Sequence, residues 1–482
     1  MTDPSKPVVN DLIAELEWRG LLHQCTDRDG LKQHLETGTR KIYAGFDPTA
    51  DSLTIGNLVP MMMLAHVRRA GHAPVVVMGG GTGLIGDPSG KSAERMLMTP
   101  ETIEQHIAKQ RPIFDEVLGK VPGPAYSIEN NADWLGKISY LEALRDIGKH
   151  FSVNMMMQKE SVKARLESRE QGISYTEFSY MILQAYDFVH LCEHQGVTCQ
   201  FGGSDQFGNI IAGIDLIRRT LKSYIGKAQF QQVMGELIRR GVVRSSDPDV
   251  DVEEMISTGR DVEEFFDKIT TSVFGLTAPL VQKADGGKFG KTESGAVWLT
   301  AERTSPYAYY QFWLNASDED ASAWIKVFTF LTRGEVEALL AEHAELPGAR
   351  ELQRRLAKEA TTILHGRAAM EQAEGAGKAL FSGDVASLDE ATLRDVLADV
   401  PSSEKDRADL ASGDGYSAIE LLKEVGLASS NREAREFIAN GSVSINGEKL
   451  APDTALGESH LLHGSLMAIR RGKKKWHLIR WS

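Results

Sequence analysis

The segment KIYAGFDPTADSLTIGN, residues 41–57, decides the fold that we expect for this chain. In its first half, isoleucine, alanine and phenylalanine alternate with Tyr43, Gly45 and Asp47. This period of two predicts a buried strand with those three residues on one face, where a phenol and a carboxylate are unusual. Pro48 ends the strand, because proline has no N–H for a sheet ladder.

The second half of this segment predicts the start of a helix. Ser52 can cap that helix, and apolar side chains continue the helical pattern as far as Val59. A strand, a polar turn and a helix N-terminus together suit an anionic ligand, because unpaired N–H groups and the helix dipole point at the turn. The alternative interpretation is an ordinary strand–turn–helix unit.

The composition is that of a globular protein with several domains. Of 482 residues, 42% are hydrophobic and 25% are charged, and the length predicts two to four domains. No apolar run approaches the ~20 residues of a membrane span, and the N-terminus lacks the order of a signal peptide. Three cysteines without an even pairing or zinc spacing indicate a reducing, cytoplasmic setting. A formal net charge of −13 argues against indiscriminate nucleic-acid binding.

A glycine-rich loop, GGGTGLIGDPSGKS at residues 79–92, follows a short apolar run that predicts a strand buried on both faces. The loop contains a literal G-x-G-x-x-G and a sequence close to a P-loop. Both matches are weak. Asp87 and Pro88 prevent a helix from starting inside the loop, and Ile85 replaces the first glycine of a P-loop. Asp87 is the candidate functional residue here.

The segment ISYTEFSYMILQAYDFVHL, residues 173–191, predicts a buried helix that begins near Thr176, since it is apolar almost all round. Tyr180, Gln184 and Asp187 stand at i, i+4 and i+7 and therefore share one face. Buried polar groups need partners. Two interpretations stay open: these side chains satisfy one another, or they line a ligand pocket.

Two later segments extend the pattern. CQFGGSDQFGNIIAG, residues 199–213, is again a strand, a glycine turn and a helix. With the earlier units it predicts a Rossmann-like, doubly wound parallel sheet that binds its ligand outside the carboxyl ends of the strands. LTAPLVQKADGGKFGKT, residues 276–292, predicts a strand and then a mobile loop, on which Lys288 and Lys291 can reach phosphate oxygens. Taken alone, such a loop is more often a plain basic turn.

The chain is predicted to contain four parts. They are an α/β domain at 1–304 with an insertion at 223–272, a small helical domain at 305–382, a linker at 383–413, and an α+β domain at 414–482. We expect a helix around Val262–Ile269 within the insertion, which has no assigned function.

The last domain is predicted to carry a basic surface. IRRGKKKWHLIRWS, residues 469–482, has six basic residues and no acidic one, and its interleaved tryptophans favour a folded strand over a solvated tail. Arg432 and Arg435 lie on a predicted helix of the same domain, and Asn446-Gly447 predicts a hairpin turn.

Together these motifs resemble one family. The chain resembles the bacterial tyrosyl-tRNA synthetases, which are class I aminoacyl-tRNA synthetases, over nearly its whole length. The shared stretches are YAGFDPTADSL, GGGTGLIGDPSGK, TEFSYMILQAYDF, FGGSDQFGNIIAG, LVQKADGGKFGKTESG, TSPYAYYQFW and IRRGKKK. KFGKT is this family's form of the class I lysine loop, and the last domain looks like an S4-type RNA-binding domain.

The resemblance implies an activity and its partners. L-Tyrosine reacts with ATP to give tyrosyl-adenylate and pyrophosphate, and the tyrosyl group then moves to the 3′ end of tRNA(Tyr). Mg²⁺ accompanies ATP, no tightly bound metal is expected, and no covalent enzyme intermediate forms. The resemblance also implies a homodimer, with contacts in the helices of residues 130–165.

The resemblance assigns roles to individual residues. Those implied for tyrosine are Tyr43 and Asp187 at the phenol, Asp87, Tyr180 and Gln184 at the ammonium group, and Gln206 near the carboxylate. Those implied for ATP and the adenylate are Gly45, Asp47, Gly56, Gly203, Asp205 and Lys291. Those implied for catalysis around the leaving pyrophosphate are Thr49, Thr54, Asn57, Lys288, Lys291 and Thr292. Those implied for tRNA are Arg432, Arg435, Arg470, Arg471, Lys473, Lys474 and Lys475.

One departure from the family's pattern bears on the rate. The family's HIGH motif is TIGN here, at residues 54–57, and Thr54 is shorter than histidine and cannot become cationic. We therefore predict slow activation, with partial compensation from Thr49 and the two lysines. The competing hypotheses are a catalytically silent paralogue that binds RNA, and the tryptophanyl relative, whose indole substrate has no hydroxyl for Tyr43 and Asp187.

Overall fold

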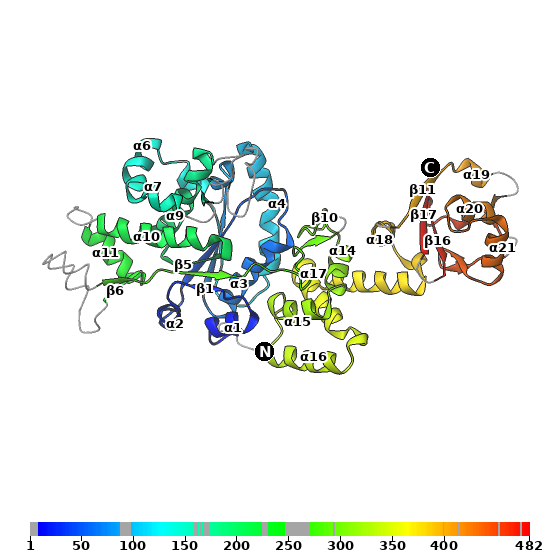
Figure 1. The fold of residues 1–482 in the computed structure, drawn as a ribbon, viewed down its shortest axis with the longest axis horizontal. Coiled ribbons are helices and arrows are strands. Elements are labelled where there is room, and N and C mark those ends of the chain that lie inside the picture. The colour runs from blue at the N-terminus through cyan, green and yellow to red at the C-terminus, as the bar shows by residue number, and fades with distance from the viewer. Residues whose placement is uncertain are drawn as a thin grey trace. The chain divides into compact units, whose positions relative to one another are not determined.

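In the computed structural model the chain divides into two compact units, Met1–Arg303 with Ser317–Leu352, and Thr304–Ala316 with Gln353–Ser482 (Figure 1). The structure describes residues 8–86, 98–158, 162–163, 166, 173–223, 230–245, 269–292, 295–398, 400–411, 415–451, 454–472 and 475–482. None of the helices within these ranges is long and apolar enough to cross a membrane.

The first unit is built on a six-stranded sheet of order β1–β8–β5–β2–β3–β4. All neighbours from β8 to β4 pair in parallel, and only β1 at the edge is antiparallel. The strands are β1 (Gln24–Cys25), β2 (Lys41–Phe46), β3 (Ala73–Met78), β4 (Ser127–Asn130), β5 (Val197–Gly203) and β8 (Phe274–Ala278). The predicted doubly wound α/β sheet is thereby confirmed.

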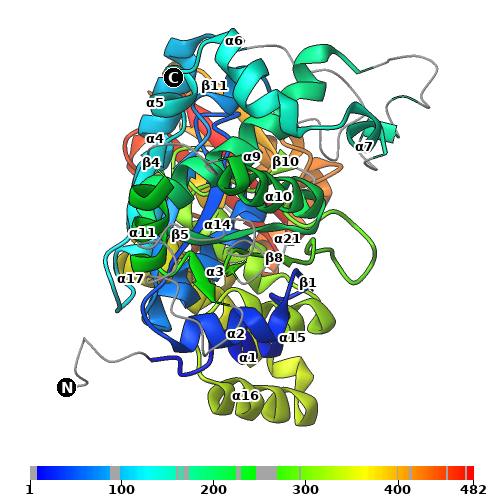
Figure 2. The same ribbon diagram turned by 90° about the vertical axis from the view of Figure 1, so that its left-hand side faces the viewer.

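Helices cover both faces of this sheet (Figures 1 and 2). The helices of the first unit are α1 (Leu12–Arg19), α2 (Arg28–Glu36), α3 (Leu58–Arg69), α4 (Pro100–Leu118), α5 (Ala132–Leu135), α6 (Tyr140–Glu142), α7 (Val153–Met157), α9 (Tyr175–Gln195), α10 (Phe207–Ser223), α11 (Phe230–Arg239), α15 (Asp318–Val327) and α16 (Arg333–Glu345).

The central strand β2 shows which helices lie on which face. Phe46 packs edge-on against Phe114 of α4, with ring centroids 4.8 Å apart. Tyr43 points to the opposite face, where its ring centroid lies 5.3 Å from that of Phe188 in α9. Since neighbouring odd and even residues of a strand face opposite ways, the alternation read from the segment 41–57 places the Tyr43 side under α9.

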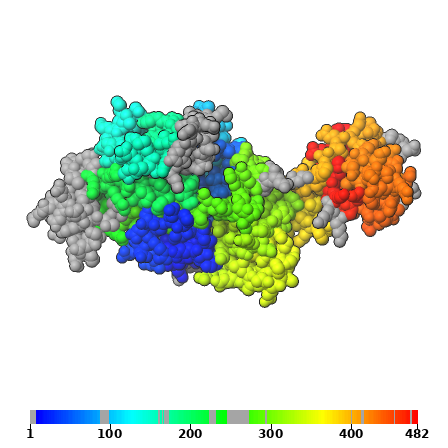
Figure 3. Space-filling model, viewed as in Figure 1, coloured from blue at the N-terminus to red at the C-terminus, as the bar shows by residue number. Residues whose placement is uncertain are grey.

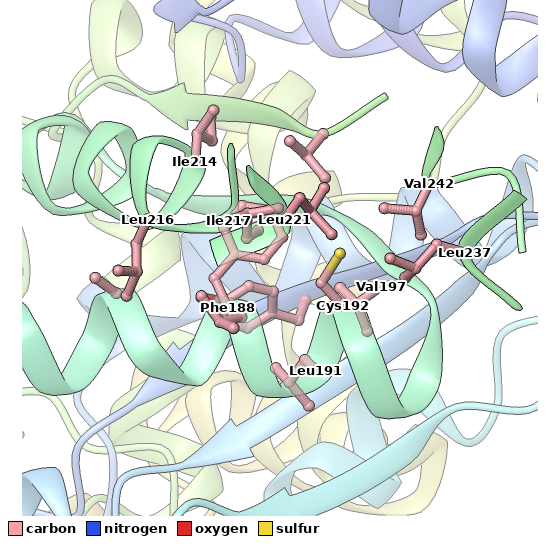
Figure 4. Close-up of a cluster of buried hydrophobic side chains, with 14 of the residues drawn as sticks. Phe188, Leu191, Cys192, Val197, Ile214, Leu216, Ile217, Leu221, Leu237 and Val242 are labelled. Carbon is pink, nitrogen blue, oxygen red and sulfur yellow. The ribbon is translucent and has the colours of Figure 1, made fainter. Parts of the chain in front are cut away.

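An apolar cluster holds α9 and α10 together and onto the sheet (Figure 4). Phe188, Leu191 and Cys192 of α9 interdigitate with isoleucine and leucine side chains of α10. Gly196 ends α9 in the left-handed conformation, at φ 69°, where a side chain would be strained. The helix that carries Tyr180, Gln184 and Asp187 is therefore firmly seated beside β2.

Two helix starts differ from those predicted. Ser52 does not cap a helix; its hydroxyl accepts a hydrogen bond from Thr300 N at 3.2 Å. The chain instead makes a 3₁₀ turn at Ile55–Asn57 before α3 begins, because contacts with a distant segment outweigh the local capping preference. Helix α9 begins at Tyr175, just before the predicted Thr176, and its cap is Ser174, whose hydroxyl accepts from Glu177 N at 3.2 Å.

Of the predicted insertion at 223–272, the structure describes residues 223, 230–245 and 269–272. Helix α11 packs its buried leucine and methionine against the α9–α10 cluster. Strands β6 (Val243–Ser245) and β7 (Ile269–Thr271) then pair antiparallel, so the chain leaves and returns side by side. Most of the predicted helix at Val262–Ile269 lies outside the described residues, and its last residue begins β7.

The second unit contains helices and a five-stranded sheet of order β11–β17–β16–β13–β14. Its helices are α14 (Pro306–Leu314), α17 (Glu351–Ser382), α18 (Glu390–Val396), α19 (Ala408–Ala411), α20 (Ala418–Glu424) and α21 (Asn431–Ala439). Its strands are β11 (Ser402–Lys405), β12 (Tyr416–Ser417), β13 (Val443–Ile445), β14 (Glu448–Lys449), β15 (Ala455–Leu456), β16 (Leu466–Arg471) and β17 (Lys475–Trp481). Figure 3 shows the final strands, in red, at the surface of this unit.

Several details of the second unit bear on the predictions. Asn446 and Gly447 both have positive φ and join β13 to β14, which confirms the predicted hairpin. The basic segment forms the β16–β17 hairpin, so it is folded as expected. Part of the stretch with linker composition is also folded, because β11 pairs in parallel with β17 at the sheet edge.

Candidate active site

A cavity of about 300 Å³ opens at the carboxyl ends of the parallel strands of the first unit. It brings together most of the residues predicted for tyrosine and the nucleotide, and two of those predicted for catalysis, Thr49 and Asn57. These are Tyr43, Gly45, Asp47, Thr49, Gly56, Asn57, Tyr180, Gln184, Asp187, Gly203, Asp205 and Gln206. The volume suits a small ligand, and the crevice outside the strand ends is where doubly wound sheets bind theirs.

A buried phenol lies at the inner end of this cavity. Tyr43 is only 1% exposed, and burial raises its pKa well above the ordinary value. Its hydroxyl has no hydrogen-bond partner among the described residues. Gln200, its register partner on β5, likewise buries an Oε1 atom for which the described part of the protein supplies no donor. Unpaired buried polar atoms are costly, so both are suited to meet a polar group of a ligand.

The carboxylate of Asp187 faces the same end of the cavity. Asn131 Nδ2 donates to its Oδ2 at 3.0 Å, and Trp134 Nε1 donates to its Oδ1 at 2.7 Å. Burial raises the pKa of Asp187 to about 7, against these two hydrogen bonds, which lower it, and with a smaller contribution from Asp47. The carboxylate is therefore held in one orientation and titrates near neutrality.

A chain of hydrogen bonds links Asp187 to the start of the cavity. Asn131 Nδ2 also donates to Thr82 Oγ1 at 3.0 Å, and Thr82 Oγ1 donates to Asp47 Oδ1 at 2.8 Å. Tyr180 OH donates to the other carboxylate oxygen of Asp47 at 2.9 Å. A Cβ atom at Gly79 would lie 2.1 Å from Asp47 Oδ1, so only glycine fits beneath this network.

The polar face of α9 is thus paired with other elements. Tyr180 bonds Asp47 of the segment after β2, and Asp187 bonds residues that follow β4. Gln184 Oε1 accepts from Asn209 Nδ2 of α10 at 3.0 Å. Of the two interpretations that the sequence left open, lining a pocket is the one the geometry supports, because all three side chains border the cavity.

The outer rim is formed by the turn after β5. Asn209 Nδ2 also donates to Gln206 Oε1 at 3.3 Å, and Gln206 Nε2 donates to Asp205 Oδ2 at 3.1 Å. A Cβ atom at Gly202 would come within 3.1 Å of Gln206 Cβ, so the glycines of this turn allow the backbone to approach. The rim therefore presents amide and carboxylate groups in a fixed array.

Sequence reasoning missed several of these residues. The region of residues 101–150 showed no chemical motif, yet Asn131 and Trp134 orient the central carboxylate. A usable signal existed for Asn131, because it directly follows a parallel strand, at the sheet edge where ligands bind. Thr82 stood inside the glycine loop, and Gln200 and Asn209 within the quoted turn segment, without a local pattern to mark them.

The TIGN segment and the lysine loop lie next to each other, since Val297 bonds to the backbone of both Gly290 and Ile55. Thr54 N and Thr54 Oγ1 both donate to Asn57 Oδ1 at 3.1 Å, and Thr54 does not line the cavity. The lysines of the loop, Lys288 and Lys291, are exposed and also lie outside the lining. Nothing is described of the Thr292 side chain, and Asp87 lies outside the described residues.

The residues predicted for RNA lie in the second unit. Arg432, Arg435 and Lys475 are exposed, whereas Lys473 and Lys474 lie outside the described residues. Arg470 lies over the ring of Trp476, at 5.3 Å from its centroid. Arg471 Nη1 donates to Leu427 O at 2.6 Å, and its guanidinium lies 4.7 Å from the ring centroid of Phe437 in α21. Arg471 thereby joins the basic strand to the helix of Arg432 and Arg435.

Comparisons with known proteins agree along the whole chain. Residues 35–249 and 250–382 match the family described as tRNA synthetases class I (W and Y), and residues 392–479 match the tyrosine–tRNA ligase SYY-like C-terminal domain. The tyrosine–tRNA ligase of Bacillus caldotenax is 46% identical over 98% of this chain and 100% of that protein. That of Geobacillus kaustophilus is 45% identical with the same coverage. A C-terminally truncated mitochondrial tyrosyl-tRNA synthetase of Aspergillus nidulans is 28% identical, with a TM-score of 0.63 over 77% of this chain and 95% of that chain.

Proposed function

The chain belongs to the tyrosine–tRNA ligase family of class I aminoacyl-tRNA synthetases, and from that premise we propose which of its residues carry the reaction. It is an ATP-dependent enzyme that activates L-tyrosine and joins it to tRNA(Tyr). We infer that the side chains around the cavity bind both substrates and perform the activation step.

The inner end of the cavity takes the substrate phenol. The observation that carries this assignment is the buried Tyr43 hydroxyl, which lacks a partner among the described residues and lies close enough to Asp187 for that carboxylate to raise its pKa. A phenol between the two groups accepts from Tyr43 and donates to Asp187. Phenylalanine would leave both groups buried and unpaired, so the site rejects it on energetic grounds.

The rest of the tyrosine molecule extends toward the rim. Tyr180, Gln184 and Asp87 receive the ammonium group, and Gln206 lies near the carboxylate. Gly45, Asp47, Gly56, Gly203 and Asp205 contact the nucleotide. In support of these assignments, the described members of both sets border one continuous cavity.

Activation is an in-line displacement at phosphorus. A carboxylate oxygen of tyrosine attacks the α-phosphorus of ATP, the bond to the bridging oxygen breaks, and pyrophosphate leaves. Thr49, Asn57, Lys288, Lys291 and Thr292 stabilise the charge that develops on the leaving phosphates, and Thr54 supports them less well than a histidine would. No proton transfer is required, so the residues contribute positioning and electrostatic stabilisation.

Mg²⁺ enters as part of the ATP substrate. No group of three or more histidine, cysteine, aspartate or glutamate side chains in the described part of the chain could hold a metal ion by itself. Mg²⁺ commonly binds through substrate phosphates with few protein ligands.

In the second step a hydroxyl of the tRNA 3′-terminal ribose attacks the tyrosyl carbonyl carbon, and AMP leaves.

Tyrosine-dependent exchange of pyrophosphate into ATP tests the activation step. We expect exchange with tyrosine and none with tryptophan or phenylalanine. Removing the hydroxyl in Tyr43→Phe should lower the preference of the enzyme for tyrosine over phenylalanine by up to about tenfold, the value of one neutral hydrogen bond. Bound tyrosine without exchange would overturn the proposal and point to a silent RNA-binding paralogue.

We further propose that the chain forms a homodimer through the exposed apolar side chains of α6 and α7, which are Tyr140, Leu141, Val153 and Met155. These side chains are 57–76% exposed, which is unusual for large apolar residues in so short a stretch of sequence. Light scattering should give a dimer for the parent and a monomer for Leu141→Glu. Leu346→Glu changes a similarly exposed leucine outside α6 and α7 and should leave the dimer intact.

The proposed setting of the enzyme is the cytoplasm. All three cysteines are free thiols, and Cys192 and Cys199 are buried among apolar side chains, as expected of a protein from a reducing compartment.

A further inference from the structure

The lysine loop is held by its phenylalanine as well as by its backbone. The Phe289 ring stacks on Phe328, with centroids 5.2 Å apart and planes 9° from parallel. It also meets Trp324 edge-on, with centroids 5.0 Å apart at 72°. Trp324 lies in α15, and Phe328 directly follows the end of that helix. Both residues are buried. We name these two residues the aromatic seat.

The aromatic seat is itself anchored to the first unit. Arg19 of α1 is 1% exposed, and its guanidinium donates to the carbonyls of Lys326, Thr329 and Leu331 at 2.6, 2.8 and 2.7 Å. These carbonyls bracket Phe328 in the sequence. Three charge-assisted hydrogen bonds from a buried arginine make a rigid support, because each would be expensive to break.

The beginning of the loop is tied to the same helix. Ala284 N donates to Asp320 Oδ1 of α15 at 2.8 Å, and Lys283 N donates to Gly287 O at 3.0 Å across the turn. In this conformation the loop therefore contacts α15 both before and at Phe289.

The far side of the loop is tied to the TIGN segment. Val297 N donates to Gly290 O at 2.9 Å, and Val297 O accepts from Ile55 N at 2.9 Å. A Cβ atom at Gly290 would lie 2.3 Å from Ile55 Cγ2, so the loop rests directly on that residue. The chain is consequently held at both residues of the dipeptide that separates the two lysines.

We propose that Phe289 is a positioning residue for adenylate formation, which acts by locking the backbone of Lys288 and Lys291 onto the aromatic seat. The inference deepens the proposed function, because it rests on the assignment of those lysines to the leaving phosphates. Both lysines are long, exposed side chains, so the position of their backbone determines whether their ammonium groups reach the phosphates. A displacement of about 1 Å at such a site costs up to ~10²-fold in rate.

Transient kinetics with matched variants test the proposal. In Phe289→Leu and Phe328→Leu the rate constant for adenylate formation should fall by about 10- to 100-fold. The dissociation constant for tyrosine should stay at its parent value, because neither residue borders the tyrosine end of the cavity. Phe289→Tyr keeps the aromatic ring and should form the adenylate at the parent rate. Phe330→Leu is the control, because its ring packs on His66 and Arg69 of α3.

The double variant Phe289→Leu/Phe328→Leu separates positioning from general loosening. If the two act through one contact, the double change should slow the reaction no more than the slower single change. Multiplied effects, an unchanged rate in Phe289→Leu, or an equal loss in the Phe330→Leu control would each overturn the inference. Lys288→Ala and Lys291→Ala serve the premise: if neither slows adenylate formation, the proposed role of the lysines fails, independently of Phe289. Melting temperatures within a few degrees of the parent confirm that each variant is folded.

Discussion

At the scale of single residues, the proposed role of Asp187 predicts how tyrosine binding responds to pH. Its pKa of about 7 follows from burial, and in the proposed site its ionised form accepts the hydrogen bond from the substrate phenol. Tyrosine affinity should therefore fall about tenfold between pH 8 and pH 6, as the competent fraction of the enzyme shrinks. Equilibrium dialysis across this pH range measures the tyrosine affinity. The Asp187→Asn variant should bind tyrosine more weakly, but its affinity should not depend on pH.

The stability of the ligand-free protein checks the sign of that shift. A carboxyl group whose folded pKa lies above its ordinary 3.8 favours folding at low pH, and this contribution is lost as the pH rises from about 4 to about 7. Asp187→Asn should thus stabilise the protein more at pH 8 than at pH 4.5. An equal change in unfolding free energy at both values would contradict the raised pKa.

A second residue, Thr54, is predicted to limit the rate of activation. Threonine is uncharged, so it offers the phosphates no cationic donor. Its hydroxyl donates to Asn57, and Thr54 does not border the cavity. Thr54→His should raise the rate of adenylate formation by at least tenfold, since one donor in the transition state is commonly worth ~10²–10³. Thr54→Val should change the rate little. A histidine variant no faster than the parent would show that TIGN does not limit catalysis.

At the scale of elements, the lysine loop depends on one close contact. Gly290 and Gly286 share a left-handed conformation, at φ 76° and 80°, so alanine strains both positions alike. A Cβ at Gly290 meets Ile55 at 2.3 Å, whereas one at Gly286 has no atom of the described structure within 4 Å. Gly290→Ala should slow adenylate formation by about tenfold or more, and Gly286→Ala far less. Rapid-quench assays measure the rate of adenylate formation in both variants. Equal losses of rate would show that backbone strain, and not the contact with Ile55, causes the effect.

At the scale of the whole molecule, charge is unevenly distributed. The chain carries a net charge of −13, yet the β16–β17 hairpin concentrates arginine and lysine in the second unit. A triple variant should bind tRNA more weakly when glutamine replaces Lys473, Lys474 and Lys475. The slope of its binding constant against salt should fall by roughly one unit per lost phosphate contact. Pyrophosphate exchange should be unaffected.

A matched control supports that prediction. Lys120→Gln removes an exposed lysine from the first unit, where it pairs with Glu116, and should leave the salt dependence unchanged. Filter binding at several salt concentrations gives both slopes. An unaltered slope in the triple variant would exclude the hairpin from the tRNA contact.

The sequence alone determined what depends on short spacings. The alternation in residues 41–57 placed Tyr43 of β2 and Asp47, just after that strand, on one side. The i, i+4, i+7 spacing placed Tyr180, Gln184 and Asp187 on one face of α9. Such patterns can be read directly from the sequence, because backbone geometry sets the periods of strands and helices. The asparagine–glycine turn could be predicted for the same reason.

Only the tertiary structure decided which distant groups meet. Trp134 has no local signature, and Asn131 has only its place directly after a strand, yet the order of the parallel strands brings both onto Asp187. The same holds for the start of α3, where pairing with residues 297–300 outweighed the capping preference of Ser52, and for the aromatic seat beneath Phe289. Contacts between elements far apart in the chain depend on register and packing, and neither leaves a period that the sequence displays.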